Sequence, residues 1–203
     1  ANLSHTYMND KTYTVILSAT NNYGTTIIQQ TVTIVTAPVA AFTFNSSVGC
    51  LPLAVLFSNS SSSNATSFAW DFQGGSPATS VDQNPVSTWN SAGVYLVTLT
   101  ASNAAGSSTA TATITVNTAP TAGFTAQTAG LSVVTSNTTL NATSYSWTFG
   151  DGGVSTEANP THTYATTGTY TITLVATNAC GSTTFTQQVA IVGTAPIASF
   201  ASN

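Results

Sequence analysis

The sequence predicts an all-β fold made of repeated sandwich modules, and two observations indicate it. The first is alternation: Tyr145, Trp147 and Phe149 lie two residues apart, and residues 170–176 repeat this pattern with apolar side chains. Such alternation is typical of strands with one buried face. The second is that no segment has a helical period, whereas threonine and valine abound where strands are predicted.

A long internal period indicates several similar modules. Tyr13, Tyr95 and Tyr170 are 82 and 75 residues apart, with matching residues around each of them. A fixed period of this length is typical of a tandem array. We predict the C-terminal half of a repeat at residues 1–36, complete repeats at 37–117 and 118–193, and the first strand of a following repeat at 194–203. We therefore expect the chain to be a window of a longer array.

The strands follow from alternating segments that are separated by turn residues. Asn21–Gly24 is an expected turn, and residues 58–63 are almost all serine and asparagine. Pro52 can begin a strand, because a proline is tolerated there. Residues 74–84 are expected to form a loop, and Trp89 to lie in one. Strands are predicted at residues 12–19, 26–35, 41–44, 53–57, 67–72, 93–102, 108–116, 121–126, 131–137, 144–149, 169–177 and 183–192.

The scarcity of charge excludes several classes of partner. Charged residues are 3% of the chain, with one lysine, no arginine and a formal net charge of −4. Phosphate binding needs several basic side chains, so nucleic acid is excluded as a partner. A polybasic membrane contact fails for the same reason. No apolar run approaches the roughly 18 residues that span a bilayer, so no membrane insertion is expected within these residues.

Three motifs follow one another at compatible spacing in the second complete repeat. They are YSWTFGDG at 145–152, NPTHTY at 159–164 and GTYTITL at 168–174. This succession resembles the PKD domain, whose hallmarks are W-D-F-G-D-G, N-P-x-H-x-Y and G-x-Y-x-V-x-L. The resemblance implies tandem immunoglobulin-like β-sandwiches arranged end to end, outside the cell. It also implies a set of core and motif residues: Trp70, Phe72, Tyr95, Trp147, Phe149, His162, Tyr164 and Tyr170.

The acidic and histidine residues do not predict a catalytic or metal site. Asp71 and Asp151 lie in different repeats, tens of ångströms apart, whereas a glycosidase pair needs roughly 5 to 10 Å. His162 is interpreted as a structural hydrogen-bonding group, since zinc needs three or four clustered ligands. Asp151 and Glu157 could form at most one weak calcium site. We predict no enzyme activity, no catalytic residue, no metal and no cofactor.

Trp89 replaces the tyrosine of the motif in the first complete repeat. An exposed tryptophan could stack on a sugar ring. The interpretation that we prefer is that Trp89 fills the same corner of the sandwich as the tyrosine.

The two cysteines lie one in each complete repeat, so neither repeat can close a bridge of its own. In tandem immunoglobulin-like sandwiches, the A–B turn of one module faces the F–G turn of the next. This places Cys50 near Cys180 and predicts a disulfide between modules, which extracellular chains favour. Two free buried thiols and pairing between chains remain as alternatives.

The prediction for function is a non-catalytic structural or adhesive array outside the cell or on its surface, as a window of a stalk or filament. Its partners would be other repeats of the same chain, like chains in a filament or bundle, and a surface glycan or polysaccharide. The alternative is that these are accessory modules of a secreted hydrolase that bind polysaccharide or protein beside a catalytic domain.

Overall fold

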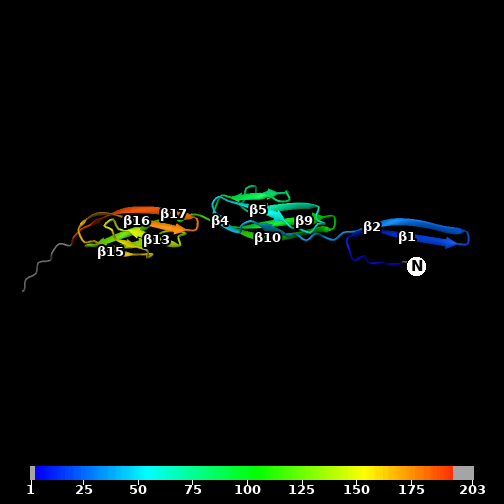
Figure 1. Cartoon of the computed structure of the whole chain (residues 1–203), viewed down its shortest axis with the longest axis horizontal. Helices are drawn as coiled ribbons and strands as arrows, with labels where there is room; N and C mark the ends of the chain where they lie inside the picture. The colour runs from blue at the N-terminus through cyan, green and yellow to red at the C-terminus, as the bar shows by residue number, and fades with distance from the viewer. Residues whose placement is uncertain (1–2, 194–203) are drawn as a thin grey trace, which may run out of the picture. The chain divides into compact units, whose positions relative to one another are not determined.

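A computed structural model describes residues 3–193, and every regular element in this part of the chain is a β-strand. Seventeen strands form five sheets there (Figure 1). The predicted all-β class is confirmed. The described residues contain no apolar helix of membrane-spanning length. The first strand of a following repeat, predicted at residues 194–203, lies outside the described part of the chain.

The first two strands form an isolated hairpin, β1 (Lys11–Asn21) and β2 (Gly24–Ile34). They pair antiparallel from Lys11↔Ile34 to Asn21↔Gly24. Apolar side chains on this hairpin remain exposed: Val15 is 43% exposed and Leu17 is 64% exposed. The hairpin therefore has no covering sheet within the described residues.

The first sandwich has a three-stranded and a five-stranded sheet. The smaller sheet, in the order β3-β5-β8, consists of β3 (Phe42–Phe44), β5 (Leu53–Asn59) and β8 (Val86–Trp89). The larger, in the order β4-β10-β9-β6-β7, consists of β4 (Val48–Cys50), β6 (Ser67–Phe72), β7 (Thr79–Ser80), β9 (Gly93–Asn103) and β10 (Gly106–Asn117).

Aromatic side chains from both sheets make the core of the first sandwich. Phe57 on β5 packs 5.5 Å from Trp70 and 5.1 Å from Phe72, measured between ring centroids. On the register between β6 and β9, Trp70 is opposite Leu99, and both are buried. Burying these large apolar side chains between the two sheets drives their association.

The second sandwich repeats this plan with sheets of three and four strands. The three-stranded sheet, in the order β11-β12-β15, consists of β11 (Phe124–Ala129), β12 (Ser132–Asn137) and β15 (Thr161–Thr163). The four-stranded sheet, in the order β14-β13-β16-β17, consists of β13 (Ser144–Thr148), β14 (Val154–Ser155), β16 (Gly168–Asn178) and β17 (Gly181–Ile191).

The core of the second sandwich is built on the same strand register as that of the first. Trp147 on β13 is opposite Leu174 on β16, and both are fully buried. Phe124 on β11 packs edge-on against Trp147 at 4.9 Å, and Val133 on β12 is fully buried in the same cluster. The contacts divide the chain into two compact units: the hairpin with the first sandwich, and the second sandwich with Gly49–Leu51.

The long strands lie where the sequence predicts them, but several short strands do not appear in the prediction. β7 lies within the segment expected to be a loop, and β4, β8, β14 and β15 were not expected as strands. The expectation of a loop at Trp89 is wrong, since this residue ends β8 and pairs with Leu53 on β5. These strands have two to four residues, too few to show a period.

Removing part of a core side chain tests the importance of this packing. We expect Leu174→Ala to lower the free energy of unfolding of the second sandwich by about 2–5 kcal/mol, because it leaves a cavity beside Trp147. Thr171→Ala, on the exposed face of the same strand, should change it by less than about 0.5 kcal/mol. Urea unfolding followed by NMR signals of the second sandwich would separate its transition from that of the first. Equal effects of the two changes would contradict this packing.

Candidate functional site

The corner after β13 brings together the polar motif residues of the second sandwich. The chain turns sharply at Gly150 and Gly152, whose φ angles are 85° and 95°. A side chain at Gly150 would also place its Cβ 2.9 Å from the backbone oxygen of Thr171. Glycine is therefore required for the turn, and the turn directs Asp151 towards β15.

The side chains of Asp151 and His162 lie within hydrogen-bonding distance of each other at this corner. Nε2 of His162 lies 2.7 Å from Oδ2 of Asp151, and the side chains are 19% and 24% exposed, respectively. The other carboxylate oxygen accepts a hydrogen bond of 2.9 Å from the backbone N–H of Gly153. The hydrogen bond from His162 and then the one from Gly153 lower the pKa of Asp151 below its ordinary value. The carboxylate thus stays ionised and fixes the turn.

Two aromatic rings pack against the His162 side chain of this pair. The imidazole of His162 stacks on Phe149 with 4.3 Å between centroids and meets Tyr164 edge-on at 4.7 Å. Tyr164 is buried, and its hydroxyl donates to the backbone oxygen of Phe149 at 3.0 Å. Burial raises the pKa of Tyr164 to about 12. Tyr170 stacks on Tyr164 at 4.1 Å, so these predicted motif residues lie together.

The first sandwich builds the same corner without the charged pair. Ser87 stands where His162 stands, and its hydroxyl donates to the backbone oxygen of Pro77 at 2.8 Å. Trp89 is fully buried, and its indole N–H donates to the backbone oxygen of Gln73 at 2.8 Å. Its ring stacks at 6.0 Å from Tyr95. Trp89 therefore fills the corner from the inside and offers no face to a sugar.

The two core tryptophans, Trp70 and Trp147, each form a hydrogen bond with the backbone of a loop. The indole N–H of Trp70 donates to the backbone oxygen of Asp82, and that of Trp147 to the backbone oxygen of Glu157, both at 2.9 Å. Burial of an indole requires a partner for its N–H. Here the partner is the loop that leads towards the next strand.

The acidic side chains do not assemble a reactive site. Within residues 3–193, no group of three or more histidine, cysteine, aspartate or glutamate residues is arranged to hold a metal ion. Both carboxylate oxygens of Asp151 are engaged by His162 and Gly153. A calcium site at Asp151 and Glu157 would have to displace these bonds.

A disulfide joins Cys50 and Cys180, with 5.4 Å between their α-carbons. Cys50 ends β4, which belongs to the sheet of β10, while the contacts of Gly49–Leu51 group with the second sandwich. Cys180 lies in the turn between β16 and β17. The described part of the chain has no free cysteine.

Asparagines hold the segments that enter each sandwich, a role that the sequence analysis missed. The side-chain amide of Asn103 donates to the backbone oxygen of Thr36 at 2.7 Å, and that of Asn178 donates to the backbone oxygen of Thr118 at 2.9 Å. Asp10 also accepts a bond of 2.9 Å from the N–H of Thr36. The signal was present as the repeated Thr-Ala-Pro segments and the asparagines at the same period.

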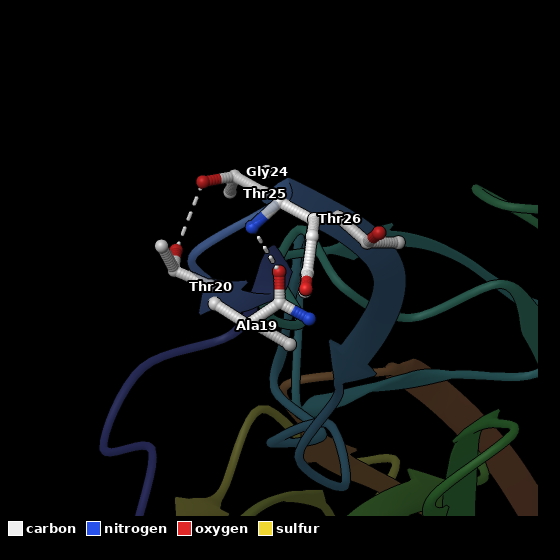
Figure 2. Close-up of a pocket in the computed structure, with 7 residues that line it drawn as sticks. Ala19, Thr20, Gly24, Thr25 and Thr26 are labelled. Atoms are coloured by element: carbon white, nitrogen blue, oxygen red, sulfur yellow. Dashed lines mark hydrogen bonds between the residues drawn. The ribbon is translucent and has the colours of Figure 1, made fainter.

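An open concavity lies at the tip of the β1–β2 hairpin (Figure 2). The hydroxyls of Thr20 and Thr25 are hydrogen-bonded there at 2.9 Å, and the side chain of Tyr23 is 98% exposed. The lining residues are Ala19, Thr20, Asn21, Tyr23, Gly24, Thr25 and Thr26. No lining residue is acidic or basic, so the concavity offers a ligand hydrogen bonds and one aromatic ring.

Asp151→Asn tests the role of the charged corner. Because the folded-state pKa of Asp151 is lowered, its carboxylate stabilises the fold above its ordinary pKa of 3.8, and this contribution is lost as the pH falls through the folded-state value. We expect Asp151→Asn to lower the free energy of unfolding at pH 7 by about 0.2–1 kcal/mol, as partly exposed pairs do. The difference should vanish near pH 2.

Urea unfolding at both pH values measures this difference. Asp71→Asn, on the exposed face of β6, is the matched control and should give a smaller change at pH 7. A deficit of Asp151→Asn that is as large at pH 2 as at pH 7 would show that the carboxylate charge is not responsible.

Comparison with known proteins identifies a metalloprotease and a collagenase as relatives. The pre-pro-metalloprotease PrtV of Vibrio cholerae is 43% identical over 84 residues, which are 39% of this chain and 9% of PrtV. Collagenase ColA of Bacillus cereus is 58% identical over 38 residues, which are 19% of this chain and 4% of ColA. The chain therefore spans less than a tenth of the length of these two relatives.

Two solved structures are similar to parts of the chain. The PKD1 domain of Vibrio cholerae PrtV is 42% identical, with a TM-score of 0.36, and the match covers 36% of this chain and 98% of that domain. A titin I-band fragment matches 78% of this chain and 66% of its own length, with a TM-score of 0.51 and 13% identity, which shows the immunoglobulin-like fold alone. Residues 35–118 and residues 117–192 each match the PKD domain. Since these two matches span most of the chain, the protein belongs to the PKD domain family.

Proposed function

We propose that these PKD modules are non-catalytic accessory modules of a secreted protease and that they bind protein substrate beside a catalytic domain. The observation that carries this proposal is that stretches of the chain are 43% and 58% identical to parts of a metalloprotease and a collagenase. In each relative the matching stretch is a small share of the protein. The Cys50–Cys180 bridge supports an extracellular location.

A protein substrate fits the surface better than a polysaccharide does. Sugar-binding modules present aromatic faces on which a sugar ring can stack, but Trp70, Trp89 and Trp147 are all buried. Of the phenylalanine, tyrosine and tryptophan side chains in residues 3–193, only Tyr23 and Phe185 are exposed, at 98% and 39%. Threonine, serine and asparagine dominate the rest of the surface, and their hydroxyl and amide groups bond readily to peptide groups.

The adhesive array is the weaker of the two functions. What supports it is a surface with few charges, which permits chains to approach one another. Neither metalloprotease PrtV nor collagenase ColA is an adhesin by name, so the similarity favours the accessory function.

A binding assay with the whole chain tests the proposal. We expect micromolar binding to immobilised collagen or gelatin and none to insoluble polysaccharides such as cellulose or chitin. Because the surface has few charges, the dissociation constant should change less than about twofold between about 50 mM and about 500 mM salt. Absence of binding to both protein matrices would contradict the proposal.

A variant of Tyr23, the more exposed of the two aromatic residues, tests the alternative that the modules bind polysaccharide. Tyr23→Ser removes the ring that lines the hairpin concavity, and Met8→Ser removes an apolar side chain that is 84% exposed and serves as the control. Polysaccharide binding that disappears only in Tyr23→Ser would establish the glycan-binding alternative and overturn protein binding as the function of these modules.

A further inference from the structure

The last strand of the second sandwich is a long sheet edge. β17 pairs with β16 at every position from Gly168↔Ile191 to Asn178↔Gly181. On its other side β17 has no strand within the described residues, since it ends the order β14-β13-β16-β17. The backbone N–H and C=O groups that point to this side are a template for another strand.

In the first sandwich, the strand equivalent to β17 is β10, and β4 pairs with its outer edge. β4 lies beside the end of β10, where the N–H of Thr115 donates to the oxygen of Ser47 at 2.8 Å and the N–H of Leu51 donates to the oxygen of Asn117 at 3.0 Å. In the second sandwich, β11 instead stays paired with β12 along its whole length. No strand within the described residues pairs with the outer edge of β17. The first sandwich shows that such an edge accepts a strand, because β4 pairs with β10 there.

β17 also lacks the features that usually block edge pairing. Its sequence, GSTTFTQQVAI, contains no charged residue and no proline, which are common protections of natural edges. Its first half is contacted from within the sandwich: the hydroxyl of Thr183 donates to the oxygen of Pro120 at 2.9 Å and accepts from the N–H of Ala122 at 3.1 Å, and Phe185 packs edge-on against Phe124 of β11 at 5.2 Å. The residues from Thr186 to Ile191 therefore form the open part of the edge.

We propose that this open edge is a self-association surface, on which β17 of one chain pairs antiparallel with β17 of a second copy about a two-fold axis at Gln188. A side-chain amide both donates and accepts, so two facing Gln188 side chains are complementary to each other. On the same face, Thr186 of each copy lies opposite Ala190 of the other. No like charges oppose one another in this register, and the interface is isologous, as two-fold dimers require. This proposal does not depend on the proposed accessory function.

Sedimentation equilibrium of the whole chain between about 1 μM and about 1 mM tests the proposal. We expect a concentration-dependent dimer in the wild-type chain. Gln188→Lys places two ammonium groups against each other at the axis and should weaken the dimer at least tenfold. The matched control is Thr171→Lys, because Thr171 is exposed on β16 directly opposite Gln188. It adds the same charge to the same face one strand farther from the axis, and the dimer should persist.

Gln188→Glu distinguishes repulsion from damage to the fold. Two carboxylates should weaken the dimer at pH 7, and protonation near pH 3.5 should restore it to the level of the wild-type chain at that pH. A wild-type chain that is monomeric throughout, or equal losses in Gln188→Lys and Thr171→Lys, would overturn the proposal. So would a dimer that survives Gln188→Lys but is lost in Leu17→Ser, since that result places the contact on the β1–β2 hairpin.

Discussion

The pairing of a tryptophan-bearing strand with the long strand opposite it is the interaction on which each sandwich depends. Trp70 faces Leu99 and Trp147 faces Leu174 in the same register. Each indole fills the space between the sheets, and its N–H holds the loop that leads to β8 in the first sandwich and to β15 in the second. One side chain thus joins the two sheets and fixes a loop. The β1–β2 hairpin shows the converse, because without such a strand the equivalent Leu17 is 64% exposed.

The parts of the fold that were predictable from the sequence are those with a period. The strands carrying Trp147 and Leu174 alternate over five residues or more, so the burial of one face was visible. The short strands were not visible, because two to four residues cannot display alternation. The different paths of the first strand in the two sandwiches depend on tertiary pairing, which local preference does not encode.

At the corner of Asp151 and His162, too, only part of the structure was predictable from the sequence. The motif predicted His162 and Tyr164 from their spacing in the sequence, but the hydrogen bond between His162 and Asp151 depends on the turn at Gly150 and Gly152, which directs Asp151 towards β15. Asn103 and Asn178 were overlooked because asparagine in a turn is common and its partner is 60 or more residues away. Variation between copies is tolerated here, since Trp89 and Ser87 fill the same corner with neutral hydrogen bonds. The charged pair of Asp151 and His162 is therefore not needed to build this corner.

The central claim is that the tryptophan-bearing strand and its sheet give each long hairpin its stability. Amide hydrogen exchange measured by NMR tests it within one molecule, because β1, β9 and β16 have similar sequences and lengths but only β9 and β16 have such a neighbour. We predict that β9 and β16 exchange about a thousandfold more slowly than β1, which corresponds to about 4 kcal/mol in the cost of opening. Equal protection of the three strands would contradict the claim.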